Sequence, residues 1–132
     1  MKHEEHLQIQ VCNYLRLQYP KVLFACDLAS GIKLSIGQAV KAGRMRQSRG
    51  YPDLMIFEAR GEYHGLMMEL KREGTRIYIR SGGMTMDAHI REQARVLEAL
   101  TNNGYKAVFA IGFDEAIKII DEYLTKKPCQ NN

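Results

Sequence analysis

The amino-acid sequence predicts an α/β fold in which helices flank a mixed central β-sheet. Segments with helical periodicity alternate with short apolar runs typical of strands, in the order α-β-β-β-α-β-α. The chain has 132 residues, a usual length for one domain with a single core. We therefore expect one domain over residues 1–127, followed by a polar C-terminal tail over residues 128–132.

The composition is that of an ordinary globular protein, with 45% hydrophobic and 26% charged residues. No apolar run approaches the length of a transmembrane helix, and the start MKHEEHLQ is too polar for a signal peptide. Cys12, Cys26 and Cys129 form no CxxC pair, and their odd number argues against a disulfide framework or a zinc cluster. They are interpreted as small hydrophobic residues or, at the tail, a free thiol. These features predict a cytoplasmic protein.

The first two elements follow from simple patterns. Apolar residues recur at helical spacing from Leu7 to Leu15, which predicts an amphipathic helix over residues 3–18. Pro20 cannot continue a helix and marks its end. The apolar run KVLFAC at residues 21–26 is predicted as a short strand.

A long connection and a hairpin are predicted next. Residues 27–51 contain several glycines and one short helical pattern at 36–42, and a connection of this length inside a compact domain is usually functional or mobile. The apolar runs at residues 53–57 and 66–71 are separated by a turn rich in charge and glycine. They are expected to pair as an antiparallel hairpin.

The second half of the chain begins with an ambiguous segment. Residues 75–80 (TRIYIR) alternate apolar and polar side chains, so they are expected either to extend the sheet or to form a separate flap. A helix is predicted over residues 87–102, closed by Gly104. Residues 106–111 are predicted as a buried strand, and Asp114 as the N-cap of the last helix.

Basic residues gather in two segments. No acidic residue lies between Asp27 and Asp53, where five basic residues are found: Lys33, Lys41, Arg44, Arg46 and Arg49. A second basic cluster consists of Lys71, Arg72, Arg76 and Arg80. Such segments are typical of proteins that bind a phosphate backbone, although a solvated loop with surplus basic residues gives the same pattern.

Two charged residues occur within a strand that is otherwise apolar. Glu69 and Lys71 are two residues apart, so they project from the same face of the strand. In an antiparallel hairpin the start of one strand lies opposite the end of its partner, so Asp53 is expected near Glu69. Two carboxylates and a backbone carbonyl form an all-oxygen site that suits Mg²⁺ or Mn²⁺. The alternative is a solvated outer face with a structural ion pair.

These residues carry a resemblance to a known family. GYPDL at residues 50–54, followed by ELK at 69–71, resembles the motif of the PD-(D/E)xK nuclease superfamily, whose core is restriction-endonuclease-like. A glutamate-rich first helix, Gln93 and the closing strand GYKAV narrow the resemblance to the virus-type replication-repair nuclease (VRR-NUC) domain. The resemblance spans residues 4–124.

The resemblance implies a role for each matching residue. Asp53, Glu69 and the carbonyl of Leu70 would coordinate the metal, and Lys71 would be the catalytic lysine. Gln93 would support the site or contact the substrate.

The first helix would add one glutamate to this site. Glu4 and Glu5 are adjacent, and Glu4 is preferred because it lies four residues before Gln8, as in the family pattern. One departure from the family is the stretch 75–87, which is longer than the short link expected before the helix that carries Gln93. His89 is interpreted as an exposed position at the start of that helix.

The sequence therefore leads to the hypothesis of a Mg²⁺- or Mn²⁺-dependent nuclease that hydrolyses phosphodiester bonds in DNA. Two alternatives stay open: a non-catalytic nucleic-acid-binding module on a nuclease fold, and a nuclease fold used only as an assembly subunit. The nucleic acid is expected to contact Lys33, Lys41, Arg44, Arg46, Arg49, Arg72 and Arg76. A homodimer acting on branched DNA is expected, in a bacterial or phage-infected cell, by resemblance to stand-alone phage versions of the domain.

Overall fold

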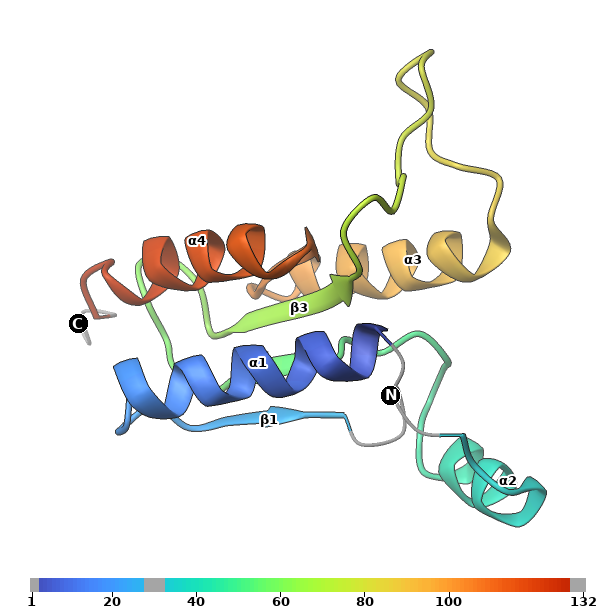
Figure 1. Ribbon diagram of the computed structural model, residues 1–132, viewed down its shortest axis with the longest axis horizontal. Helices are drawn as coiled ribbons and strands as arrows, with labels where there is room; N and C mark the ends of the chain where they lie inside the picture. The colour runs from blue at the N-terminus through green and yellow to red at the C-terminus, as the bar shows by residue number, and fades with distance from the viewer. Residues whose placement is uncertain (1–2, 28–32, 129–132) are drawn as a thin grey trace.

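The computed structural model describes residues 3–27 and 33–128 (Figure 1). It confirms the α/β fold with a mixed sheet. In the described residues the elements are α1 (His3–Gln18), β1 (Phe24–Cys26), α2 (Ile36–Arg44), β2 (Leu54–Ile56), β3 (Leu66–Lys71), α3 (Ala88–Asn102), β4 (Lys106–Ile111) and α4 (Phe113–Leu124). None of the helices in these residues is long and apolar enough to cross a membrane.

The sheet has the strand order β1-β2-β3-β4. The predicted hairpin is present, since β2 pairs with β3 in antiparallel register, with Leu54 opposite Met68. β1 pairs antiparallel with β2, whereas β4 pairs parallel with β3. All six residues of β3 are buried, because β3 has a strand on each side and helices over both of its faces.

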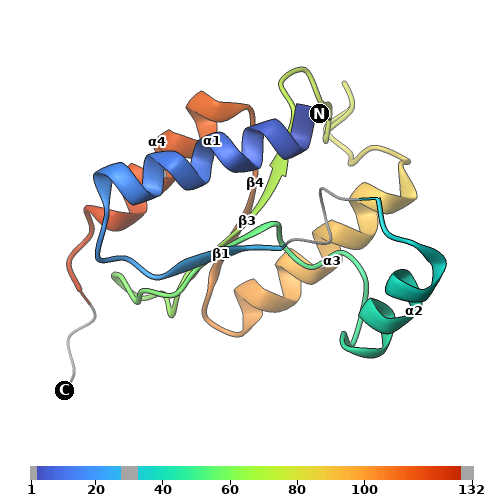
Figure 2. The ribbon, with the colours of Figure 1, turned by 60° about the horizontal axis from the view of Figure 1, so that its bottom comes forward.

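Helices cover the two faces of the sheet unequally. Figure 2 shows α1 and α4 on one side of the sheet and α3 on the other. The main core lies between the sheet and the α1–α4 layer. Its fully buried side chains include Val11 and Leu15 of α1, Met68 of β3 and Ile120 of α4. Burial of this apolar surface is the main force that holds the layers together.

A polar contact joins the two helices of that layer. Tyr14 and Tyr19 both donate a hydrogen bond to Oδ1 of Asp121, each over 2.7 Å. The hydrogen bond to Asp121 and burial raise the pKa of Tyr14 to about 12, and burial with the same acceptor raises the pKa of Tyr19 to about 12. The end of α1 is thereby tied to α4.

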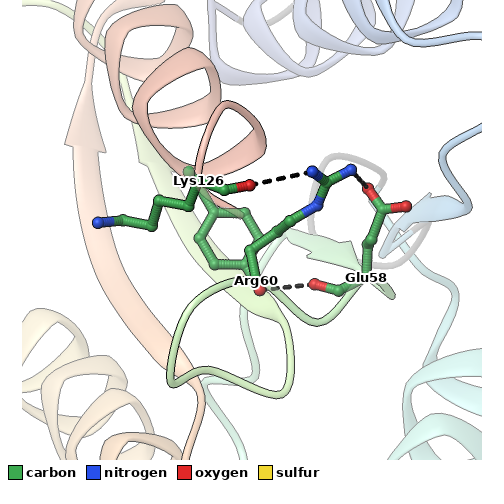
Figure 3. Close-up of polar contacts among 4 residues, drawn as sticks. Glu58, Arg60 and Lys126 are labelled. Atoms are coloured by element: carbon green, nitrogen blue, oxygen red, sulfur yellow. Dashed lines mark hydrogen bonds and ion pairs between the residues drawn. The ribbon is translucent and has the colours of Figure 1, made fainter. Parts of the chain in front are cut away.

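The turn between β2 and β3 is fastened to the end of α4 (Figure 3). Arg60 donates from Nη1 to the carbonyl of Lys126 over 3.1 Å and from Nη2 to Glu58 over 2.9 Å. The hydroxyl of Tyr123 donates to the carbonyl of Glu58 over 2.6 Å. These contacts hold the hairpin at the end of the sheet away from Asp53.

Two expectations are corrected by the structure. The strand predicted over residues 21–26 pairs only over Phe24–Cys26, because only those residues face β2. The last helix begins at Phe113 with Gly112 as its N-cap, so Asp114 lies in the first turn and is not the cap. Gly112 turns the chain at a φ of 83° while its N–H donates to the carbonyl of Lys71, which starts the helix directly after β4.

Two segments project from the end of the sheet where β3 ends. α2 has no buried residue and stands apart from the body of the molecule, as Figures 1 and 2 both show. Residues 75–86 form the second projection, coloured yellow-green in Figure 1, and they do not extend the sheet. The flap alternative for this segment is therefore the one observed. We call residues 75–86 the arm.

Candidate active site

Asp53 and Glu69 lie opposite each other across the hairpin. Leu54 pairs with Met68, so continuing the register by one residue places Asp53 opposite Glu69 on the same face. Side chains in such a pair are about 5 Å apart at Cβ. Asp53 is 5% exposed and Glu69 is 3% exposed. Two buried carboxylates therefore meet where β2 begins and β3 ends.

Backbone groups fix the position of Asp53. The N–H of Leu70 donates to Oδ2 of Asp53 over 2.8 Å, because β2 no longer offers Leu70 a backbone partner. In a strand the N–H and C=O of one residue point to the same side. The carbonyl of Leu70 thus lies on the edge of β3 that faces β2, the edge on which the Leu70 N–H meets Asp53. The N–H of Asp27 adds a bond of 2.7 Å to the carbonyl of Asp53.

Glu69 is held by the helix on the same face. Nε2 of Gln93 donates to Oε1 of Glu69 over 2.7 Å, and it lies 3.2 Å from Nε2 of His89. Oε1 of Gln93 is buried and accepts no hydrogen bond from the described residues. Gly50 lets the loop before β2 pass close to the backbone of α3. A Cβ at this position would lie 3.2 Å from the backbone nitrogen of Gln93, and the φ of Gly50 is 80°.

Lys71 projects from the same face as Glu69 and is 6% exposed. Its backbone is fixed on the other side, where the carbonyl accepts from Gly112 over 2.8 Å. Within the described chain, the Lys71 ammonium forms no ion pair. Burial of such a charge is costly unless it has a use, which makes Lys71 a candidate functional residue.

The side chains described above share one pocket of about 520 Å³: Asp53, Glu69, Lys71 and Gln93. Its lining residues come from β3, from the start of α3 and from the loop before β2. They are Asp27, Arg46, Arg49, Gly50, Tyr51, Asp53, Glu69, Lys71, Arg72, Thr75, Asp87, His89, Ile90 and Gln93. The structure thus gathers carboxylates, a lysine and arginines around a space that a phosphodiester could enter.

The predicted nucleic-acid-binding residues occupy different positions. Arg49 and Arg72 are exposed and line the pocket. Lys41 and Arg44 are exposed at the end of α2, and Lys33 and Arg76 are also exposed. Arg46 differs, because its Nη2 donates to both carboxylate oxygens of Asp27, at 2.8 and 2.6 Å. That ion pair holds Arg46 against the pocket wall.

The first-helix glutamate is only partly placed. Glu4 lies in α1, but its side chain is outside the described residues. Glu5 is half-buried and Gln8 is buried. Figures 1 and 2 show that α1 begins at the end of the sheet where β3 finishes, which is the end that carries Asp53. The choice between Glu4 and Glu5 stays a prediction.

Sequence reasoning missed several pocket residues, among them His89 and Asp27. His89 was read as an exposed helix start; it is exposed, yet it lines the pocket and contacts Gln93. Its spacing of four residues from Gln93 on one helix was the available signal. Asp27 carried no signal, since its ion pair with Arg46 and its bond to Asp53 depend on how β1 meets β2.

The donor atoms suit a hard divalent cation. Asp53, Glu69 and the Leu70 carbonyl provide only oxygen, which favours Mg²⁺ or Mn²⁺ over zinc. Among the described residues, no group of three or more His, Cys, Asp or Glu side chains could hold a metal ion. The proposed ligand set contains only two such side chains, Asp53 and Glu69, and takes its third oxygen from the backbone carbonyl of Leu70. These oxygen donors fit a hard divalent cation.

Carboxylates opposed across a hairpin, with a lysine two residues after the second, are the arrangement of the PD-(D/E)xK nuclease superfamily. The fold is similar to that of a solved structure described as a "VRR_NUC domain protein", with a TM-score of 0.68 and 34% sequence identity. The similarity covers 97% of this chain and 93% of that chain. No family model and no curated protein matches the sequence.

Identity at this level over nearly the whole of both chains establishes the family. The chain belongs to the VRR-NUC domain family. Membership of a nuclease family implies a nucleic acid as partner, and the family generally uses divalent metals.

Proposed function

We propose that this protein is a Mg²⁺- or Mn²⁺-dependent deoxyribonuclease that hydrolyses phosphodiester bonds. The observation that carries the proposal is the cluster of Asp53, Glu69 and Lys71, all less than 7% exposed, in one pocket with two exposed arginines. Buried ionisable side chains of both signs that gather in one pocket favour chemistry over structural support.

We assign a role to each residue of the proposed catalytic set. Asp53, Glu69 and the Leu70 carbonyl would hold the cation, which when bound would supply Lewis-acid activation of a phosphoryl oxygen and of a water molecule. Lys71 orients the attacking water or stabilises negative charge on the phosphate. Gln93 fixes Glu69, and its second amide atom, Oε1, accepts a hydrogen bond from water or substrate. Glu4 would add its carboxylate to the cation or to its waters, as the family resemblance implies.

The preferred substrate is branched DNA, such as a four-way junction, and the active form is a homodimer. The pocket is lined by Arg46 and Arg49, which follow α2, and by Arg72 and Thr75 near the base of the arm. Because α2 and the arm both project from the body of the molecule, one chain would contact nucleic acid well beyond the bond it cleaves. Two copies related by a two-fold axis would place two pockets at a fixed spacing, which suits paired incision of a symmetric substrate.

Cleavage of labelled DNA with Mg²⁺, with Mn²⁺ and with a chelator tests the reaction. Asp53→Asn, Glu69→Gln and Lys71→Ala should each abolish cleavage and leave binding largely intact, because phosphate contacts supply most of the affinity. The matched control is Glu122→Gln, an exposed carboxylate on α4. Near-normal cleavage by two of the three site variants would overturn the assignment. Binding by the wild-type chain without cleavage in any metal would identify a binding module.

A further inference from the structure

The arm is a self-contained hairpin anchored at its base. The N–H of Ile79 donates to the carbonyl of Gly83 over 2.8 Å, and the N–H of Thr85 donates to the carbonyl of Ile77 over 2.8 Å. Ile77 is 4% exposed, and Nε of Arg91 on α3 donates to the carbonyl of Thr85 over 2.9 Å. These contacts fix the base of the arm, so its outer part is presented in a defined direction.

The outer part of the arm combines apolar and basic side chains. Tyr78 is 65% exposed and Ile79 is 50% exposed. Arg76 and Arg80 are exposed beside them. No acidic residue lies between Gly74 and Asp87. Exposed apolar groups that project from a small protein mark a contact surface, and the flanking charge selects a negatively charged partner.

The arm continues the wall of the catalytic pocket. Arg72 and Thr75 line the pocket that holds Asp53, and they also line a second depression together with Arg76 and Thr85 at the base of the arm. A nucleic acid with a phosphate in the catalytic pocket would therefore lie close to the base of the arm. This continuity and the charge favour nucleic acid over a second protein as the partner of the arm.

We propose that the arm binds an unstacked base of the substrate, with Tyr78 against the face of the base and Arg76 and Arg80 on the neighbouring phosphates. The proposal rests on the proposed nuclease function and adds a structural basis for a preference for branched DNA. An aromatic side chain stacks on any base whose face is free, whatever its sequence. Bases at a branch point have such free faces, whereas bases inside a linear duplex are covered by their neighbours.

Binding measured with a chelator present separates this contact from cleavage. The probes are a four-way junction with 2-aminopurine at the branch point and a linear duplex with 2-aminopurine in its centre. Tyr78→Ala should weaken junction binding about tenfold and remove the change in 2-aminopurine fluorescence, since one base stack is lost. Binding to the duplex should change less than twofold. Tyr78→Phe, which keeps the ring, should behave like the wild type.

Two further variants complete the test. Phe57→Ala removes an exposed aromatic side chain at the far end of β2 and should change neither affinity nor fluorescence. The double variant Arg76→Ala and Arg80→Ala should weaken binding to both probes. It should also reduce the slope of log affinity against log salt by about 1.8, as expected for two lost phosphate contacts.

Unchanged junction affinity and fluorescence in Tyr78→Ala would overturn the proposal. Conversion of a dimer to a monomer by Tyr78→Ala, with unchanged affinity per chain, would also overturn it and assign the arm to contact between copies. The experiments distinguish a failure of this proposal from a failure of the proposed nuclease function. A chain that cleaves DNA without dependence on Tyr78 refutes only the role of the arm. A Tyr78-dependent fluorescence change without cleavage in any metal refutes only the catalytic function.

Discussion

Lys71 illustrates the conflict between stability and function in single side chains. The side chain of Lys71 is 6% exposed, so its ammonium group loses most of its hydration. Within the described residues, no ion pair compensates for this loss. A side chain of similar length without charge would fit the same space. Sites that keep such a residue usually do so at the expense of stability.

We therefore predict that Lys71→Met abolishes cleavage without lowering stability. The free energy of unfolding, measured by urea titration without divalent metal, should stay the same or rise by up to about 1 kcal/mol. Lys118→Met, at an exposed position of α4, is the control and should affect neither quantity. A loss of more than about 1 kcal/mol in Lys71→Met would show that the lysine supports the fold.

Cys12 and Cys26 show a contact between side chains from different elements. Their sulfur atoms are 3.1 Å apart, one on α1 and one on β1. The hydrogen-bond contact with Cys26 is the largest influence on Cys12 and lowers the pKa of its thiol from 9.0 to about 7, against the opposing effect of burial. The same contact and burial raise the pKa of Cys26. The contact thus favours the thiolate of Cys12 over that of Cys26.

The alkylation rate of Cys12 should follow this pKa. Only the thiolate reacts, so the rate with iodoacetamide should rise with pH and reach half its maximum near pH 7. Cys26→Ala removes the donor that stabilises the thiolate, which should move this midpoint upward towards 9.0. Peptide mass spectrometry separates Cys12 from the other cysteines. An unmoved midpoint in Cys26→Ala would contradict the assigned cause.

The contact between α1 and α4 converges on one carboxylate. Asp121 accepts from Tyr14 and from Tyr19, which belong to the end of α1 and the turn that follows it. We predict that Asp121→Ala lowers the free energy of unfolding by roughly 1–3 kcal/mol, because two hydroxyls lose a charged acceptor. Thermal and urea unfolding measure this. Glu122→Ala, an exposed neighbour, should change stability little; an equal loss there would assign the effect to the helix itself.

The same contact predicts a loss of stability in alkali. The pKa of each tyrosine is raised from 10.0 to about 12 in the folded protein, so folding favours the protonated hydroxyl. The resulting stabilisation is complete below pH 10 and is lost as the pH rises through 12. The Asp121→Ala variant should show a shallower decline over this range.

For the whole molecule, assembly and substrate choice are linked. The catalytic pocket is lined by residues that follow α2 and by residues near the base of the arm, and a two-fold dimer would repeat that arrangement at a fixed distance. We predict a homodimer that cleaves a four-way junction faster than a linear duplex of the same sequence. Light scattering at micromolar concentration and cleavage of the matched substrates test both parts. A monomer that cleaves both substrates equally would leave a simpler metal-dependent nuclease.

Much of this molecule could be predicted from local patterns. Helical spacing located α1 and α3, and two apolar runs around a charged turn located the hairpin of β2 and β3. The antiparallel register then placed Asp53 opposite Glu69, because pairing follows from the turn and from alternation along each strand. The family resemblance also pointed to Gln93 before its bond to Glu69 was seen.

Other features depended on the packing of distant segments. The alternation at residues 75–80 is compatible with a strand of the sheet or with a projecting arm. The tertiary structure decides for the arm, because residues 77–85 hydrogen-bond with one another and pair with no strand of the described sheet. The start of α4 at Phe113 follows from the turn that Gly112 makes after β4. The ion pair of Asp27 with Arg46 and the contact of Cys12 with Cys26 join residues far apart in sequence. The periodicity of the sequence determines which face of its own helix or strand a residue occupies. The contacts listed above depend instead on how the helices and strands pack against one another.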